Sequence, residues 1–262
     1  EPARVIETRG YEVLRGLSAP APLEATRAPP DGLPARFGPP ALHAEAPIWL
    51  AEGVEIAGPG MAFYSLLGHA PELGPTLFTD AAVARLRALL GPHMHLELVG
   101  AVLSDEGRRF TEWESHLGGI DDERWRRAGR RPRQDHVRRV VHFLFLEDMG
   151  PETGPWRVLP RAVGDPVDPP ASLHAPDWPG HVELALAAGD VLLLEESVWH
   201  CVIPRRRPGR RRFVGAYFAS DRAAPTEAND PLLDRLEPDD PRLRSLLEHR
   251  PRSERPGPEK LR

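Results

Sequence analysis

The sequence predicts a mainly β (α+β) fold: a double-stranded β-helix of the jelly-roll or cupin kind, with flanking helices. Apolar segments of strand length recur between about residues 93 and 219, and long loops separate them. The 31 Pro and 23 Gly favour turns and loops over a helical bundle. At 262 residues the chain is long enough to bury a large core.

The chain shows no internal repeat and no second hydrophobic core, so we expect a single domain over residues 1–262. Residues 1–60 are dense in proline and predict a wrapping arm. The β-helix core is expected over residues 93–222. Residues 223–262 form a C-terminal extension, and the composition of its tail, from residue 250, is typical of disorder.

The secondary-structure signals appear in chain order. Thr79 and Asp80 precede an amphipathic segment that stops at Gly91, which predicts a capped helix. Period-two patterns or apolar runs then predict strands at 93–103, 110–116, 137–146, 156–160, 182–187, 190–194 and 213–219. The proline-rich excursion at 165–180 is long enough for a lid over a site. A final helix is expected at 240–248.

Charge and composition exclude several kinds of function. Only Lys260 among the 34 basic residues is a lysine, so the arginine runs reflect a general bias. With a net charge of −5 they do not indicate nucleic-acid binding. No apolar run reaches membrane-spanning length. The single cysteine, Cys201, excludes an internal disulfide, and we expect a cytoplasmic protein.

Two histidines carry the main chemical signal. His116 is expected on one strand, and His200, 84 positions later, at the end of another. Neutral imidazoles on neighbouring strands are suitable ligands for one Fe(II) ion. A 2-His-1-carboxylate site would place an acidic residue two positions after the first histidine, where this chain has Gly118. Because the chain has 11 histidines, a purely structural role for the pair remains an alternative.

The order of motifs around these histidines resembles a known family. An acidic turn at 147–153 leads into Gly154-Pro155 and Pro160, a Gly189-Asp190 strand precedes Trp199-His200, and an arginine follows. This pattern, over about residues 95 to 222, resembles the phytanoyl-CoA dioxygenase family of Fe(II)/2-oxoglutarate enzymes. Members of that family typically have Pro-Gly-Ser-His where this chain has Pro-Arg-Ala-Val at 160–163.

The resemblance implies that His116 and His200 bind iron, with 2-oxoglutarate and O2 as cosubstrates. It also implies that an arginine one strand beyond His200 binds the distal carboxylate of 2-oxoglutarate. We select Arg211 over Arg210 and Arg212, because the family frame places the arginine there. A guanidinium offers two parallel donors to a carboxylate. His142 would donate a hydrogen bond to the cosubstrate, although a buried core histidine is an equally simple interpretation.

Gly118 makes the reaction type the open question. Iron halogenases related to this family have Gly or Ala at that position, so that chloride or bromide binds the metal, and the resemblance therefore implies a halogenase. Two alternatives remain. A substitute carboxylate, either Asp121 or one of Asp122, Glu195 and Glu196, would give a hydroxylase, and a site without metal would leave a non-catalytic binding barrel. In each case we expect a biosynthetic small molecule as ligand, free or carrier-bound, which the sequence does not identify.

Overall fold

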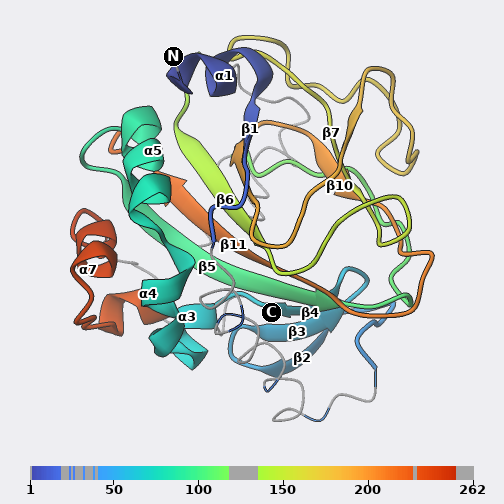
Figure 1. The fold of residues 1–262 in the computed structure, drawn as a ribbon, viewed down its shortest axis with the longest axis horizontal. Helices are drawn as coiled ribbons and strands as arrows, with labels where there is room; N and C mark the ends of the chain where they lie inside the picture. The colour runs from blue at the N-terminus through green and yellow to red at the C-terminus, as the bar shows by residue number, and fades with distance from the viewer. Residues whose placement is uncertain are drawn as a thin grey trace.

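The computed structural model describes residues 2–18, 24, 26, 32, 38, 41–117, 135–226 and 229–251. Within these residues, no helix combines the length and the apolar character that a membrane crossing requires. The path of the chain is drawn in Figure 1.

The largest element is an antiparallel sheet of eight strands, which runs diagonally across Figure 1. From one edge to the other its strands are β1 (Tyr11–Leu14), β9 (Val191–Glu195), β6 (Arg139–Phe145), β11 (Arg211–Ala219), β5 (His95–Ser104), β4 (Gly60–Phe63), β3 (Val54–Ala57) and β2 (Ile48–Ala51).

A second, smaller sheet faces the first. It contains β10 (His200–Val202), β7 (Trp156–Val158) and β8 (Val182–Leu184), again antiparallel. Side chains of β7 and β10 pack with those of β6, β9 and β11 in one buried cluster. Two facing antiparallel sheets of this kind form a jelly roll, so the predicted fold class is confirmed.

Helices cover the other face of the large sheet, as Figure 1 shows for α3, α4, α5 and α7. The helical segments are α1 (Pro2–Arg9), α3 (Leu66–His69), α4 (Gly74–Leu77), α5 (Asp80–Leu90), α7 (Pro241–Leu247) and two 3-10 turns, Pro71–Leu73 and Pro231–Arg235. The predicted capped helix is confirmed as α5: Thr79 Oγ1 accepts a hydrogen bond from Ala82 N at 3.2 Å, and Gly91 follows with a φ of 90°. Asp240 caps α7 in the same way.

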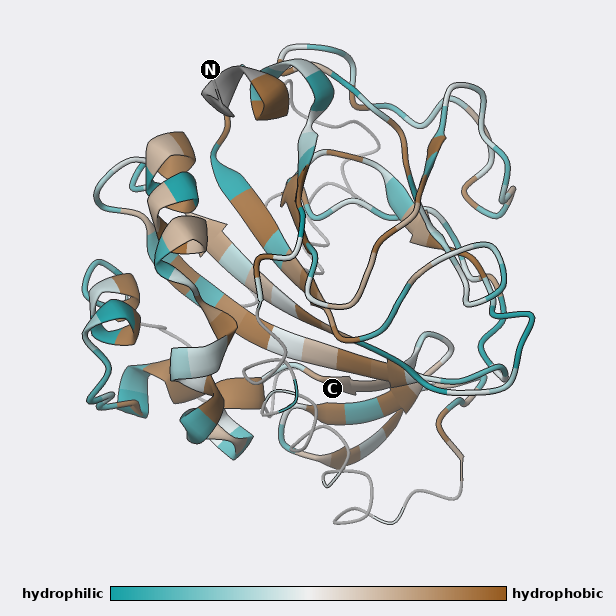
Figure 2. Cartoon of the chain, viewed as in Figure 1, coloured by the Kyte–Doolittle hydropathy of each residue, from teal (hydrophilic) through white to brown (hydrophobic). Residues whose placement is uncertain are grey.

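Successive side chains along the central strands point to opposite faces of the large sheet and contribute to two hydrophobic cores. On β6, Val140 and Leu144 face the helices, whereas Val141 and Phe143 face the small sheet. Because both faces are covered, every residue of β6 is buried. Figure 2 accordingly shows hydrophobic residues concentrated along the central strands and hydrophilic ones in the loops at the rim. The site lies on the small-sheet side.

The structure corrects the predicted elements at three places. The proline-rich arm contains β1 to β3, and β4 follows at its end, so half of the large sheet precedes the expected core. Residues 110–116 form no strand; they make one isolated bridge, at Glu114. The 190–194 strand does not continue to His200: β9 ends at Glu195, and after a turn His200 begins β10.

Asp190 attaches the N-terminal segment to the large sheet. This buried carboxylate accepts hydrogen bonds from Arg15 Nη1 at 2.6 Å, Gly16 N at 2.8 Å and Ala187 N at 2.9 Å. It thereby joins the residues after β1 to the turn before β9, the two strands that pair. The acidic residue of the Gly-Asp motif therefore has a structural role.

We expect Asp190→Ala to lower the free energy of unfolding by about 2–4 kcal/mol, because three donors lose one charged acceptor. Chemical denaturation measures this change. Asp148→Ala is the matched control, since the Asp148 carboxylate accepts one bond, from Ala188 N, and should cost about 1 kcal/mol. Equal costs for the two variants would contradict the role assigned to Asp190.

Candidate metal centre

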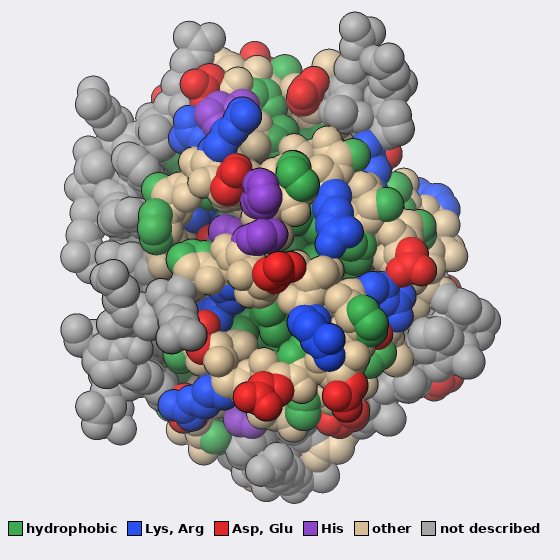
Figure 3. Space-filling view, turned by 90° about the vertical axis from the view of Figure 1, so that its left-hand side faces the viewer, with side chains coloured by type: hydrophobic (Ala, Val, Ile, Leu, Met, Phe, Trp, Pro, Cys, Tyr) green, Lys and Arg blue, Asp and Glu red, His purple; other side chains and the backbone are tan. Residues whose placement is uncertain are grey.

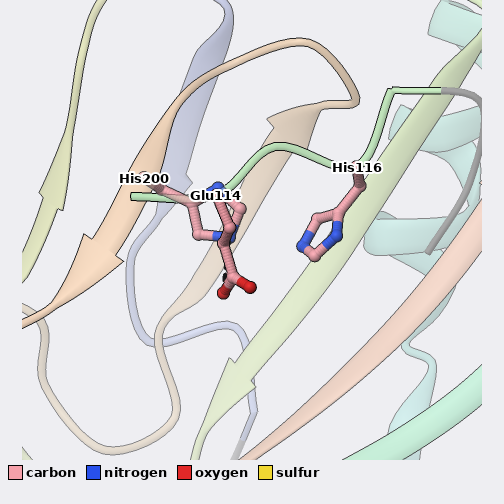
Figure 4. Close-up of side chains that lie close together, drawn as sticks. All are labelled: Glu114, His116 and His200. Atoms are coloured by element: carbon pink, nitrogen blue, oxygen red, sulfur yellow. Dashed lines mark ion pairs between the residues drawn. The ribbon is translucent and has the colours of Figure 1, made fainter. Parts of the chain in front are cut away.

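The candidate site is organised by one backbone bridge. Glu114 N donates to His200 O, and His200 N donates to Glu114 O, each at 2.9 Å. Residues paired in this way in an antiparallel bridge project their side chains to the same face. His116 lies two positions after Glu114 and shares that face by alternation. Figure 4 shows the three side chains directed into one space.

Glu114, His116 and His200 can each offer a ligand atom, and these atoms lie within 4.8 Å of one another. Both histidines are buried, whereas the Glu114 side chain is half exposed. The two imidazole rings are 4.8 Å apart between centroids. The arrangement is therefore a cluster of two imidazoles and one carboxylate that is open on the carboxylate side.

The protonation of His200 fits a metal ligand. Burial lowers the pKa of His200 to about 4, so the ring is neutral at pH 7. Its Nδ1 lies 3.1 Å from Val198 O, and a carbonyl only accepts, so Nδ1 carries the proton. Nε2 therefore carries a lone pair instead of a proton. It lies 3.5 Å from Glu114 Oε1 and is buried without a hydrogen-bond partner among the described residues. Two acceptors that face each other in this way fit a shared cation.

His116 has matching properties. Burial, together with the neighbouring His200, holds its pKa well below the usual range, so it too is a neutral imidazole. The Tyr217 hydroxyl lies 3.4 Å from His116 Nε2. Trp156 stacks on the His200 ring at 5.5 Å and 5°, and Phe143 packs against both histidines. These aromatic rings fix the ligand orientations and limit the access of water.

The opposite face of the same bridge is a tryptophan cluster. Trp113 and Trp199 immediately precede Glu114 and His200, so alternation places them behind the ligands. Their indole N–H groups donate to Ala175 O and Val167 O, and Trp178 donates to Ser172 O. The 165–180 excursion is therefore fixed behind the ligand residues. Trp156, in contrast, lies on the ligand side, where it stacks on His200.

Arg211 is buried on the site face of β11, with Phe213 and Tyr217. Its guanidinium donates to Ser104 Oγ at 3.2 Å, Ile203 O at 2.9 Å and Gly154 O at 3.3 Å. Nη2 has no hydrogen-bond partner, and no carboxylate among the described residues pairs with Arg211. Burial and the positive charges of Arg108 and Arg205 hold its pKa well below its usual range. Such an unpaired charge fits an anionic ligand.

The competing arginines lie elsewhere. Arg212 points to the other side of β11 and binds the Glu147 carboxylate at 2.6 Å, while Arg210 is exposed.

Other candidates from the sequence are not brought to the cluster. His142 is on the helix side of β6, edge to face with Phe78, while its neighbour Phe143 contacts the two histidines. Gly118 and Asp121 lie outside the described residues. Glu195 accepts from Ser197, and Glu196 pairs with Arg139 at 3.4 Å, so both carboxylates are used away from the cluster.

Glu114 was not predicted from the sequence. A carboxylate was expected two positions after His116, whereas Glu114 lies two positions before it. Period-two alternation puts both positions on the same face of an extended segment, so the signal was present in the Glu-Ser-His triplet.

Several solved structures have the same fold as this chain. The complex of HygX from Streptomyces hygroscopicus with nickel, 2-oxoglutarate and hygromycin B matches with a TM-score of 0.59 and 16% identity, covering 84% of this chain and 86% of HygX. SnoK, a non-haem α-ketoglutarate-dependent carbocyclase from nogalamycin biosynthesis, matches with a TM-score of 0.59 and 16% identity, covering 92% and 91%. AviO1 from Streptomyces viridochromogenes Tue57 gives 0.60 and 18%, covering 86% and 96%.

No family model and no curated protein sequence matches the chain. At 16–18% identity, the likeness to these proteins establishes a shared fold. The resemblance to the phytanoyl-CoA dioxygenase family and the halogenase motif stay predictions. The chemistry of this chain must therefore be argued from its own residues.

We expect Arg211→Met to leave the free energy of unfolding unchanged or to raise it by up to about 2 kcal/mol, because an uncompensated buried charge is removed. Arg139→Met is the matched control. Arg139 is equally buried, but it pairs with Glu97 at 2.9 Å, and its loss should cost about 3–5 kcal/mol. Denaturation at pH 7 compares the two. A loss of stability in Arg211→Met equal to that of Arg139→Met would show that Arg211 is a structural residue.

Proposed function

We propose that the chain is a non-haem Fe(II)- and 2-oxoglutarate-dependent oxidative enzyme that acts on a small molecule. The observation that carries the proposal is the cluster of Glu114, His116 and His200, two neutral imidazoles and one carboxylate within 4.8 Å. Two histidines and one carboxylate with open positions are the ligand set typical of non-haem Fe(II) oxygenases. HygX and SnoK, which share the fold, are proteins that bind or depend on 2-oxoglutarate.

In this proposal Glu114, His116 and His200 hold the metal, and Arg211 binds one carboxylate of 2-oxoglutarate. Bound Fe(II), with 2-oxoglutarate and O2, supplies an oxidant that is able to attack unactivated C–H bonds. The protein holds both imidazoles neutral by burial and orients them with Trp156 and Phe143. Arg211, desolvated before any ligand arrives, offers its unpartnered Nη2 to an anion.

We further propose that Glu114 is the substitute carboxylate, in place of Asp121. The Glu114 carboxylate already lies 3.5 Å from the ligand nitrogen of His200 and would occupy a position that a halide needs. This favours the hydroxylase or dioxygenase alternative over the halogenase expected from Gly118. The halogenase remains the second candidate because of Gly118, and the experiments below separate the two.

The substrate is proposed to be a small molecule, free or carrier-bound. HygX is seen with hygromycin B, and SnoK belongs to nogalamycin biosynthesis, so proteins of this fold accept bulky natural products. A nucleic acid is a poorer candidate. On the face drawn in Figure 3, basic and acidic side chains of the described residues are interspersed, without a continuous basic patch.

The protein is expected to bind one Fe(II) under anaerobic conditions and, with 2-oxoglutarate, to develop the visible metal-to-cosubstrate charge-transfer band. Glu114→Gln should weaken Fe(II) binding by about tenfold or more, since a charged ligand is replaced by a weak neutral one. Glu72→Gln, the same change at an exposed position in the 3-10 turn Pro71–Leu73, is the control and should bind Fe(II) normally. No band in the native protein would favour a non-catalytic barrel.

Chloride separates the two reaction types. If Glu114 is a ligand, chloride should leave the native band unchanged, whereas Glu114→Gly should open a position and make the band chloride-dependent. The spectra are compared with and without chloride at equal ionic strength. A native band that shifts with chloride would contradict the role of Glu114 and support halogenation.

A further inference from the structure

Two guanidinium groups are buried beside the candidate metal centre. Arg108 is 5% exposed and Arg211 is 0% exposed. Neither forms an ion pair with a carboxylate within the part of the chain that the structure describes. The other deeply buried arginine of the large sheet, Arg139, binds Glu97 and Glu196. Arg108 has no part in the function proposed so far, and its burial needs an explanation.

One turn links the two groups. β5 ends at Ser104, whose hydroxyl accepts a hydrogen bond from Arg211 Nε at 3.2 Å. The chain then turns back, with Arg108 N donating to Asp105 O at 3.2 Å. Arg108 Nη1 donates to Pro59 O at 3.1 Å, which fixes the guanidinium. The ends of both side chains are therefore held by backbone or hydroxyl oxygens.

Both groups retain unused donors. Arg108 Nε and Arg211 Nη2 are buried, and neither has a hydrogen-bond partner among the described residues. A buried N–H group without a hydrogen-bond acceptor costs free energy. Each of these two nitrogens is therefore suited to donate a hydrogen bond to a ligand.

Arg108 interacts electrostatically with both Arg211 and Glu114. The positive charge of Arg108 lowers the pKa of Arg211. Burial lowers the pKa of Arg108 to about 10, and the Glu114 carboxylate opposes this shift by raising the pKa of Arg108. When a metal engages Glu114, two positive charges remain for an incoming ligand. A dianion would neutralise them.

We propose that Arg108 is a second carboxylate-binding residue, so that a dicarboxylate is held at both ends, by Arg211 at one end and by Arg108 on the Glu114 side. This inference rests on the proposed function, because 2-oxoglutarate is the dicarboxylate concerned. The inference also goes beyond metal binding. It requires that the two arginines bind a dicarboxylate even when no metal is present.

Glutarate is the probe, since it has the two carboxylates and the chain length of 2-oxoglutarate but lacks the 2-oxo group. Calorimetry on the metal-free protein should detect glutarate binding. Arg108→Met and Arg211→Met should each weaken it by about tenfold or more, the loss expected for a charged bidentate contact. Pentanoate, which has one carboxylate, should bind the native protein as weakly as glutarate binds Arg108→Met.

Arg109→Met is the matched control, because Arg109 is the exposed neighbour of Arg108. It should bind glutarate like the native protein. Arg108→Lys keeps the charge and most of the volume but not the planar pair of donors, and it should lie between the native protein and Arg108→Met. Circular dichroism of each variant confirms folding before titration.

Undiminished glutarate binding in a folded Arg108→Met or Arg108→Lys would overturn the role of Arg108, and equal binding of pentanoate and glutarate would overturn two-ended binding. A native protein that forms the Fe(II)–2-oxoglutarate band but does not bind glutarate without metal would refute this inference and leave the proposed function standing. Glutarate binding that requires both arginines, in a protein that forms no band, would support the dicarboxylate pocket and refute the oxidative function.

Discussion

Two backbone hydrogen bonds between Glu114 and His200 determine where the three candidate metal ligands lie. The bridge they form aligns two extended segments that are far apart in sequence, and alternation then sorts their side chains. Glu114, His116 and His200 project to one side, while Trp113 and Trp199 project to the other. Ligand geometry and the packing behind it thus follow from the same pairing, and a shift by one residue would exchange the two sets.

Buried charge is handled in two different ways in this protein. Around Arg139, carboxylates neutralise the guanidinium and join the strands β5 and β6 to the turn after β9. Around Arg108 and Arg211, oxygens of the backbone and of Ser104 hold the groups without neutralising them. The first arrangement stabilises the fold. The second is expected not to stabilise the fold and to favour the binding of an anion, which is typical of functional sites.

The sequence predicted those helices and strands that carry a recognisable local signal, such as a capping residue or an apolar run. The cap and glycine stop of α5 and the apolar runs of β6 and β9 are of this kind. The early strands β1 to β4 were missed because four-residue strands between prolines leave almost no periodic signal. Glu114 was missed because a carboxylate was expected only after His116, although alternation places the residue two positions before it on the same face. Gly118 lies outside the described residues, and the halogenase motif stays a prediction.

The N-terminal strand has a consequence for association between molecules. β1 occupies one edge of the large sheet, and its four residues pair with β9 in full register. Without it, the hydrophobic strand β9 would present a row of unpaired N–H and C=O groups. The Asp190 carboxylate holds β1 in place through Arg15 and Gly16. β1 therefore covers the edge of β9, and its detachment would expose a fully buried hydrophobic strand as a template for edge-to-edge aggregation.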